Sequence, residues 1–158
     1  MNVLGLCSGV GGLERALRWA GGRTVCYVER NPFRQQVLQA RIASGDLDNA
    51  PIWDDLFTFD ARPWRGVVDC VASGVPCQPF SAAGKRRGEL DPRNLWPETK
   101  RIVAECGPAV VFLENVPPVL HYAYHEILPS LQEMATSVRH PSSPPPPRWV
   151  RAILGDGY

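Results

Sequence analysis

Several patterns that define common protein classes are missing from this chain. Its 158 residues include five cysteines, an odd number, and no two of them form a C-x-x-C pair. Neither a disulfide framework nor a zinc site is therefore expected, and free thiols suit a reducing cytosol. No apolar run approaches the roughly 18 residues of a membrane span, and the N-terminal MNVLGLCSG lacks the basic start of a signal peptide. The sequence predicts a cytoplasmic protein without a metal site or a membrane partner.

The chain also lacks an excess of charge of either sign. The formal net charge is +1, so no global basic field announces a nucleic-acid partner. With 44% hydrophobic residues the chain can bury a core, and its length fits one domain. We expect that domain over residues 1–139. Residues 140–158 contain four consecutive prolines and are expected to be a disordered tail.

Short apolar runs alternate with segments of helical periodicity, which is typical of a parallel sheet covered by helices. The predicted strands are residues 3–6, 23–29, 51–56, 67–72 and 109–113. One predicted helix follows residue 12, and three more cover 31–43, 93–106 and 119–134. Asn31 and Pro32 are a typical helix start, as N-cap and first helical residue. The side chains expected to pack inward are Leu13, Leu17 and Ala20 (or Ala16) on the first helix, and Phe33, Val37, Ala40 and Ile42 on the second.

The first predicted strand ends in a glycine-rich turn that favours a nucleotide-type ligand. Glycines let the backbone approach a ligand, and the helix that follows favours negative charge at its N-terminus. The pattern is G-x-G-G, so a pyrophosphate is not specifically indicated. Glu29, at the tip of the second strand, stands where a carboxylate would hold a ribose diol. At the end of the third strand Asp54 is the candidate for an adenine amino group, with Asp55 as its competitor.

Two further loops lie at carboxyl ends of predicted strands, where open α/β sheets bind ligands. Cys77 stands between Pro76 and Pro79 after the fourth strand and is a candidate nucleophile. Glu114 and Asn115 end the fifth strand. A thiolate and a carboxyl brought together in this way suit attack on an electron-poor ring. The other four cysteines are expected to pack in the core.

Taken together, these motifs resemble those of the cytosine-C5 DNA methyltransferases from residue 3 to about residue 134. The motifs are the glycine turn at 6–14, Glu29, an acid at Asp54, the Pro-Cys-Gln loop at 74–87, and Glu-Asn-Val at 114–116. The resemblance implies an α/β, Rossmann-like, S-adenosylmethionine-dependent methyltransferase fold. Its sheet would be mostly parallel with helices on both faces, and its C-terminal strands would be missing.

The resemblance also assigns roles. The cofactor would be S-adenosylmethionine, and the partner double-stranded DNA with its target cytosine flipped out. Cys77 would add to C6 of that cytosine, and Glu114 would hold the base through N3 and the exocyclic amine. The expected catalytic residues are Cys77, Gln78, Glu114 and Asn115. The expected cofactor contacts are Leu6, Cys7, Ser8, Gly9, Gly11, Gly12, Glu29, Arg30, Asp54, Asp55, Leu56 and Pro76. The expected DNA contacts are Ser81, Lys85, Arg86 and Arg87.

Departures from the family pattern set further expectations. Family members often carry Asp and Phe where this chain has Gly5 and Cys7. The loss of the aromatic side chain at position 7 should weaken cofactor binding without abolishing it. Nothing after Met134 resembles the Gln-x-Arg-x-Arg motif or a target-recognition region. The chain is therefore expected to be a truncated remnant, or one half of a split enzyme whose recognition half is a second chain. The gene would be prokaryotic or phage-encoded.

Other functions stay open on the sequence alone. A transfer-RNA methyltransferase would share the C5 chemistry and these motifs. A NAD-type oxidoreductase would explain the glycine turn and Glu29 but gives Cys77 and Glu114 no role. A restriction-modification enzyme, a phage enzyme and an orphan methyltransferase would all carry the same motifs.

Overall fold

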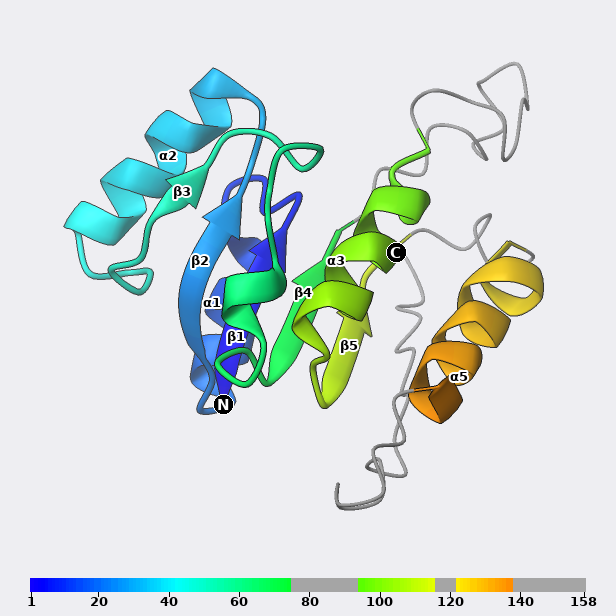
Figure 1. The fold of residues 1–158 in the computed structure, drawn as a ribbon. Coiled ribbons are helices and arrows are strands. Elements are labelled where there is room, and N and C mark those ends of the chain that lie inside the picture. The colour runs from blue at the N-terminus through cyan, green and yellow to red at the C-terminus, as the bar shows by residue number, and fades with distance from the viewer. Residues whose placement is uncertain (75–93, 116–121, 138–158) are drawn as a thin grey trace.

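The computed structural model describes residues 1–74, 94–115 and 122–137 (Figure 1). Along the chain the elements are β1 (Asn2–Leu6), α1 (Gly12–Trp19), β2 (Arg23–Val28), α2 (Pro32–Ala43), β3 (Ile52–Trp53), the 3₁₀ turn η1 (Arg62–Trp64), β4 (Cys70–Ser73), α3 (Trp96–Cys106), β5 (Val110–Leu113), the π-helical turn η4 (Ala123–Ile127) and α5 (Leu128–Ser137).

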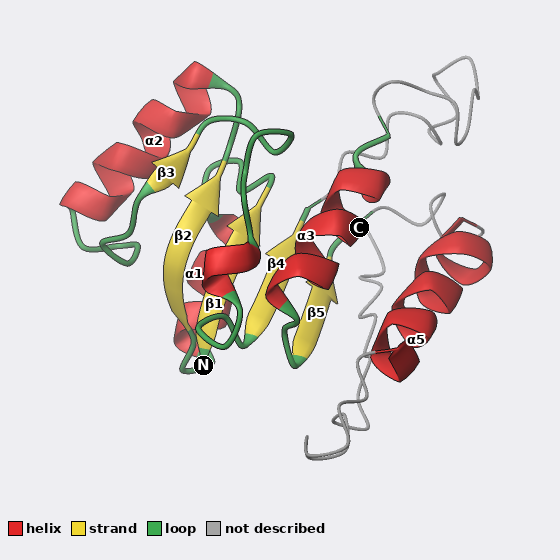
Figure 2. Ribbon diagram, viewed as in Figure 1, coloured by secondary structure: helices red, strands yellow, loops and turns green. Residues whose placement is uncertain are grey.

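The described strands form one parallel sheet with the order β3-β2-β1-β4-β5 (Figure 2). The chain builds outward from β1 to β3 and then returns to lay β4 against the other side of β1. The direction of winding therefore reverses between β1 and β4, and open α/β sheets bind their ligands at such a switch point. The predicted α/β class and the parallel sheet are confirmed.

Helices cover both faces of the sheet. Successive strand residues point to opposite faces, so neighbouring residues of β1 pack against different helices. Leu4 and Leu6 belong to a core that includes residues of α3 and α5. Val3 belongs to a separate cluster against which Leu13 and Leu17 of α1 pack. Figure 1 shows α1 behind the sheet and α3 in front of it. The predicted two-sided helical cover is confirmed.

Two strands differ by more than one residue at an end from the ranges that the sequence predicts. The predicted third strand (51–56) is reduced to Ile52–Trp53, because Asp55 Oδ1 accepts a hydrogen bond from Phe57 N (3.0 Å) and turns the chain. The predicted fourth strand (67–72) becomes Cys70–Ser73. Val67 instead closes a turn, with its N–H donating to Trp64 O (3.0 Å), and is 45% exposed.

The helices differ in packing and length from their predictions. Leu13 and Leu17 pack inward as expected, but Ala16 and Ala20 are exposed. On α2 the predicted core residue Phe33 is 71% exposed, and Leu38, which was not predicted, is fully buried. The reason is that α2 lies at the sheet margin and turns only a narrow stripe toward Tyr27 of β2.

The helix ends show where local signals were sufficient and where they were not. The predicted cap of α2 is confirmed, since Asn31 Oδ1 accepts a hydrogen bond from Arg34 N (3.1 Å). The helix predicted from residue 93 begins at Trp96, with a proline in its first turn. The predicted helix 119–134 appears as η4 followed by α5 up to Ser137, and residues 119–121 lie outside the described part. None of the described helices is long and apolar enough to cross a membrane.

Candidate cofactor and catalytic site

The candidate residues form a row along one edge of the sheet. Pairing places Leu6 opposite both Val28 and Ser73, Val28 opposite Trp53, and Ser73 opposite Leu113. All five strands therefore end at the same level. The residues that follow them, in spatial order, are Asp54, Glu29, Cys7, Gly74 and Glu114. With neighbouring strands about 4.8 Å apart, the row spans roughly 19 Å, enough to place two bound groups side by side.

The glycine turn after β1 is shaped by backbone that only glycine adopts easily. Gly11 caps α1 with φ 81°, and its N–H donates to Ser8 O (2.8 Å). A Cβ at this position would also meet the methyl groups of Leu47 and Leu38, the latter at 3.0 Å. A side chain at Gly11 is therefore opposed by both conformation and space. The turn holds its shape and leaves the N-terminus of α1 facing the row.

Glu29 ties this turn to the next helix. Its Oε2 accepts a hydrogen bond from Gly9 N (2.7 Å), and its Oε1 accepts one from Asn31 N (2.8 Å). Only 5% of the residue is exposed. A carboxylate has about four acceptor positions, so two remain for a ligand such as a ribose diol. Sequence reasoning found the position of Glu29 but missed its role in holding the turn.

Cys7 stands in the middle of the row without the character of a nucleophile. Burial, and next the negative charge of Glu29, raise the pKa of its thiol to about 12. Burial raises the pKa of Cys26, Cys70 and Cys106 to about 11 each. A thiol acts as a nucleophile in its thiolate form, and none of these four is poised to ionise near neutral pH. Cys7 also has φ 53°, an unusual conformation for a residue with a side chain.

The β3 end of the row is more open. Asp54 and Arg30 are exposed, whereas Asp55 is half-buried and uses Oδ1 in the turn to Phe57. Leu56 is buried in the core, and its carbonyl accepts a hydrogen bond from Arg101 Nη2 (3.0 Å). The structure therefore leaves both acids near the edge, and the choice between Asp54 and Asp55 stays open.

Glu114 occupies the other end. Its N–H donates to Ser73 O (3.0 Å), which fixes its backbone to β4, while its side chain is exposed. A Cβ on Gly74 would lie 3.7 Å from Glu114 Oε2 and 3.9 Å from Cys7 O. The Glu114 carboxyl therefore lies beside the switch point between β1 and β4, where it can accept hydrogen bonds from a ligand.

Several predicted site residues lie outside the described part of the chain. They are Pro76, Cys77, Gln78, Ser81, Lys85, Arg86 and Arg87. Their roles stay predictions, as does that of Asn115, which is described and half-buried. Within the described ranges no group of three His, Cys, Asp or Glu residues could hold a metal ion.

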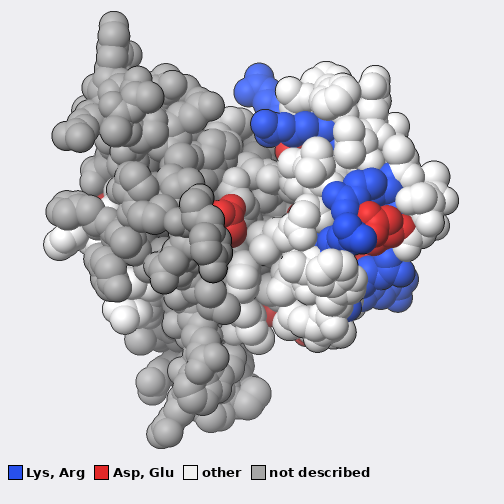
Figure 3. All heavy atoms as spheres, turned by 180° about the vertical axis from the view of Figure 1, so that it is seen from behind, with Lys and Arg blue, Asp and Glu red and all other residues white. Residues whose placement is uncertain are grey.

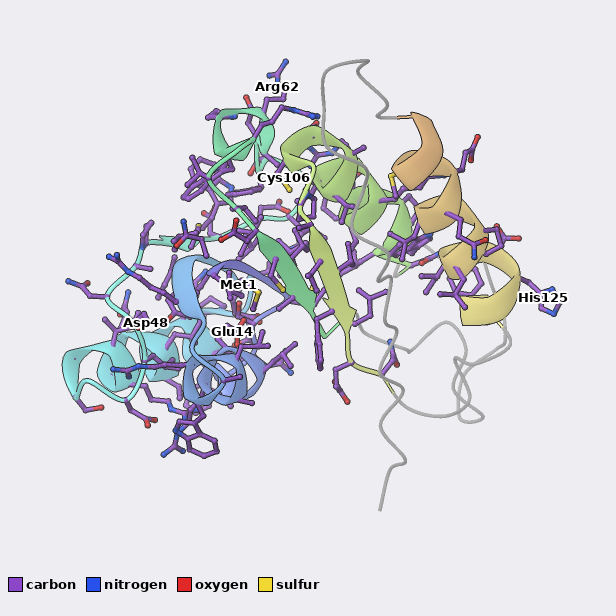
Figure 4. The ribbon with its side chains drawn as sticks, turned by 90° about the horizontal axis from the view of Figure 1, so that it is seen from below. Met1, Glu14, Asp48, Arg62, Cys106 and His125 are labelled. Atoms are coloured by element: carbon purple, nitrogen blue, oxygen red, sulfur yellow. The ribbon has the colours of Figure 1, made fainter. Side chains whose placement is uncertain are left out.

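Glu14 is the functional candidate that sequence reasoning missed. It lies in the first turn of α1 and is only 1% exposed, although glutamate is rarely fully buried in proteins. Figure 4 shows it inside the molecule, whereas Arg62 and His125 lie at the periphery. One signal could have found it: Glu14 stands three residues before Leu17 and so on the inward face of a short helix.

Buried polar atoms near the row lack partners within the described part. They are Ser8 Oγ, Glu14 Oε2 and Ser73 Oγ. Buried polar groups are nearly always hydrogen-bonded in folded proteins, so unpaired ones mark places where a ligand or ordered water supplies the partner. Two of the three residues, Ser8 and Ser73, stand at or just after strand ends in the row. The Ser73 hydroxyl can donate and Glu29 can accept, which fits a polar, hydroxyl-bearing cofactor.

The face on the α1 side of the sheet carries several Lys and Arg residues, with Asp and Glu residues among some of them (Figure 3). Arg15 and Arg41 both contact Asp46, at 2.8 and 2.7 Å, and Arg18 lies 3.4 Å from Asp48. Positive and negative charges are interleaved here, which offers little to a phosphate backbone. This surface is therefore a poor candidate for nucleic-acid contact.

The open parallel sheet, its switch point and the polar row define a Rossmann-like α/β protein of the methyltransferase type. The chain belongs to the C-5 cytosine-specific DNA methylase family, whose model matches residues 1–138. Membership in that family implies a methyl donor.

Curated relatives agree with this assignment. The Type II methyltransferase M.NgoMIV of Neisseria gonorrhoeae is 38% identical over 117 residues, which cover 72% of this chain and 35% of that protein. The Type II methyltransferase M.Eco47II of Escherichia coli is 32% identical over 158 residues, 97% of this chain and 36% of that protein. The chain thus spans about a third of the length of these relatives.

A solved structure has the same fold. A DNA modification methyltransferase encoded within an Escherichia coli prophage superposes with a TM-score of 0.65 at 26% identity, over 87% of this chain and 38% of the other. Spodoptera frugiperda DNMT2 superposes with a TM-score of 0.62 at 21% identity, over 85% of this chain and 40% of the other, a likeness of fold alone.

Proposed function

We propose that this chain binds S-adenosylmethionine and carries the nucleophile and the base-holding carboxylate of a DNA cytosine-C5 methyltransferase. The observation that carries this proposal is the row at the carboxyl edge. It gathers Glu29, the glycine turn and Glu114 from strands far apart in the sequence.

S-adenosylmethionine would supply an electrophilic methyl group. Glu29 would accept hydrogen bonds from its ribose hydroxyls while still holding Gly9 N and Asn31 N. The turn from Ser8 to Gly12 would contact the rest of S-adenosylmethionine. Asp54 or Asp55 would accept a hydrogen bond from the adenine amino group. The two unused acceptor positions of Glu29 support this assignment.

Cys77 is proposed to add as thiolate to C6 of the target cytosine, which makes C5 nucleophilic. Glu114 would hold the ring through N3 and the exocyclic amine as charge develops. C5 would then take the methyl group, lose its proton to a base, and release Cys77. Two observations support these roles: the described thiols are held uncharged, and the Glu114 carboxyl is exposed beside the switch point.

The substrate is proposed to be double-stranded DNA with the cytosine flipped out of the helix, because a stacked base hides C5 and C6 from a protein side chain. Ser81 and the cluster Lys85, Arg86 and Arg87 are proposed to contact the phosphates. Their closeness in sequence to Cys77 supports this. A second chain carrying a target-recognition region is proposed as the partner in this reaction.

Calorimetry of the full chain with S-adenosylmethionine tests the cofactor part. We expect one-to-one binding in the micromolar range, with S-adenosylhomocysteine as a second ligand and NAD as the negative control. A folded chain that binds NAD and not S-adenosylmethionine would contradict the proposal.

Covalent trapping tests the chemical part. Duplex DNA with 5-fluorocytosine in place of cytosine cannot lose a proton from C5, so the Cys77 adduct should persist and be found by mass spectrometry on Cys77. Unsubstituted DNA is the control and should leave no adduct. Transfer of labelled methyl groups to transfer RNA and not to DNA would keep the chemistry but overturn the proposed substrate.

A further inference from the structure

Glycine at position 5 leaves a space that another side chain fills. Gly5 lies in the central strand β1, opposite Tyr27 of β2 and Ala72 of β4. A Cβ built on Gly5 would lie 2.7 Å from Ser8 Oγ and 3.0 Å from Glu14 Cδ, and it would overlap Glu14 Oε1. The Glu14 carboxyl therefore sits where a strand side chain would otherwise be, between the strand and the glycine turn.

Burial makes this arrangement costly. Glu14 is 1% exposed, and neither its Oε2 nor Ser8 Oγ has a full hydrogen bond within the described part. Burial is the main reason that the pKa of Glu14 is raised, and the neighbouring Ser8 hydroxyl opposes that rise. An apolar residue on this inward face of α1 would avoid the penalty of a buried carboxyl. A costly group at the edge of a site points to a role in the site.

Ser8 connects this carboxyl to the turn. The Ser8 N–H donates to Val28 O (3.1 Å), and the Ser8 carbonyl accepts from Gly11 N (2.8 Å). The next residue, Gly9, is held by Glu29. A shift of Ser8 would therefore also move the backbone of residues 9–11, which lies beside the row.

We infer that Glu14 is a positioning residue of the cofactor site: its carboxyl, wedged between Gly5 and Ser8, sets the conformation of the turn at residues 8–12. This inference rests on the proposed function in one respect, namely that residues 8–12 bind the methyl donor. Glu14 acts from behind the turn, on the side that faces α1 and β1.

Four variants of the full chain test the inference: Glu14→Ala, Glu14→Gln, the double variant Gly5→Asp/Glu14→Ala, and Glu126→Gln as a control on the exposed surface of η4. Hydrogen exchange followed by mass spectrometry reports the opening of residues 8–12 without any ligand. Calorimetry with S-adenosylmethionine reports affinity separately.

For Glu14→Ala we expect exchange in residues 8–12 to rise about tenfold while β2 and α2 stay near wild type, and affinity to fall about tenfold. Glu14→Gln should stay within twofold of wild type in both, because its side-chain amide fills the same space. The double variant should recover most of the loss, because an aspartate on Gly5 brings a carboxyl back to this place. Glu126→Gln should change nothing.

Unchanged exchange in Glu14→Ala, or exchange raised equally throughout the sheet, would overturn the inference. So would a Glu14→Gln variant as loosened as Glu14→Ala. If Glu14→Ala does not fold, Glu14→Gln decides: native exchange supports the inference, and loosened exchange overturns it. A wild-type chain that binds no S-adenosylmethionine refutes the proposed function, yet the exchange measurements still decide the role of Glu14.

Discussion

The two sides of the row are built in opposite ways. On the β1–β2 side, carboxyl groups are buried: Glu14 is 1% exposed and Glu29 is 5% exposed, with both oxygens of Glu29 bound to backbone N–H groups. On the β4–β5 side, the backbone N–H of Glu114 bonds to Ser73 of β4, and its carboxyl is exposed. The difference suits two tasks. The β1–β2 side forms a rigid surface for a bound ligand, and the β4–β5 side presents a carboxylate to an incoming group.

This contrast implies that mutations on the two sides should be separable. Removing the buried Glu29 carboxyl should lower both folding stability and ligand affinity, because two backbone donors lose their partner. Removing the Glu114 carboxyl should affect chemistry alone, because that side chain is exposed. The predictions below are arranged from the largest expected effect to the smallest.

Cys77→Ser should lower methyl transfer by at least about three orders of magnitude, because a serine hydroxyl is a far weaker nucleophile than a thiolate. Affinity for S-adenosylmethionine should stay within twofold of wild type. Transfer of labelled methyl to duplex DNA, with any partner chain present, gives the rate. Cys106→Ala, which removes a buried thiol at the end of α3, is the control and should keep transfer. Equal rates for Cys77→Ser and wild type would remove the nucleophile assignment.

Glu114→Gln should lower methyl transfer roughly 10²–10³-fold, because an amide cannot offset the charge that develops on the base. The melting temperature should match that of wild type, since the carboxyl is exposed. Thermal unfolding and transfer assays on the same preparation separate the two effects. A clear drop in melting temperature would mean that this side of the row is as structural as the other.

Glu29→Ala should weaken S-adenosylmethionine binding by roughly 1–3 kcal/mol, about 5- to 150-fold, because donors and ligand hydroxyls lose their acceptor. It should also lower the melting temperature, since Gly9 N and Asn31 N lose their partner. Glu29→Gln keeps one carbonyl acceptor and should fall between wild type and alanine in both measurements. Unchanged affinity at a lowered melting temperature would move the ribose contact to another residue.

Glu14→Gln should become more stable relative to wild type as the pH rises. The pKa of Glu14 is raised in the folded state from its ordinary value of 4.5, chiefly by burial. Below that value the residue is protonated in both states and costs nothing. Above it the unfolded chain ionises first, so wild type loses stability until the pH passes the folded pKa. Glutamine has no proton to lose.

The measurement is the free energy of unfolding in urea between pH 4 and pH 8 for both proteins. The other ionisable groups within electrostatic reach of Glu14 are Cys7, Tyr27, Glu29 and Arg41, and they are common to both proteins. A difference between the two proteins that stays constant with pH would show that folding does not raise the pKa of Glu14.

Local signals predicted local structure well. The N-cap at Asn31 and the glycine turn were readable because a few adjacent residues determine them. Predictions failed where packing decides. Phe33 is apolar yet exposed, because α2 lies at the sheet margin, and the strand at 51–56 is cut short by the Asp55 turn. Periodicity gives a face of a helix but not the depth to which that face is buried.

The sequence by itself determined the class of fold, the family, and the loops that carry the candidate site residues, because these are written in short motifs and in alternation along the chain. Only the tertiary structure decided that those residues share one level across five strands, since the register depends on pairing between distant segments. It also decided that Glu29 is a structural anchor as well as a ligand candidate, and that Glu14 fills the space left by Gly5. These contacts join residues through three-dimensional packing, and no spacing in the sequence encodes them.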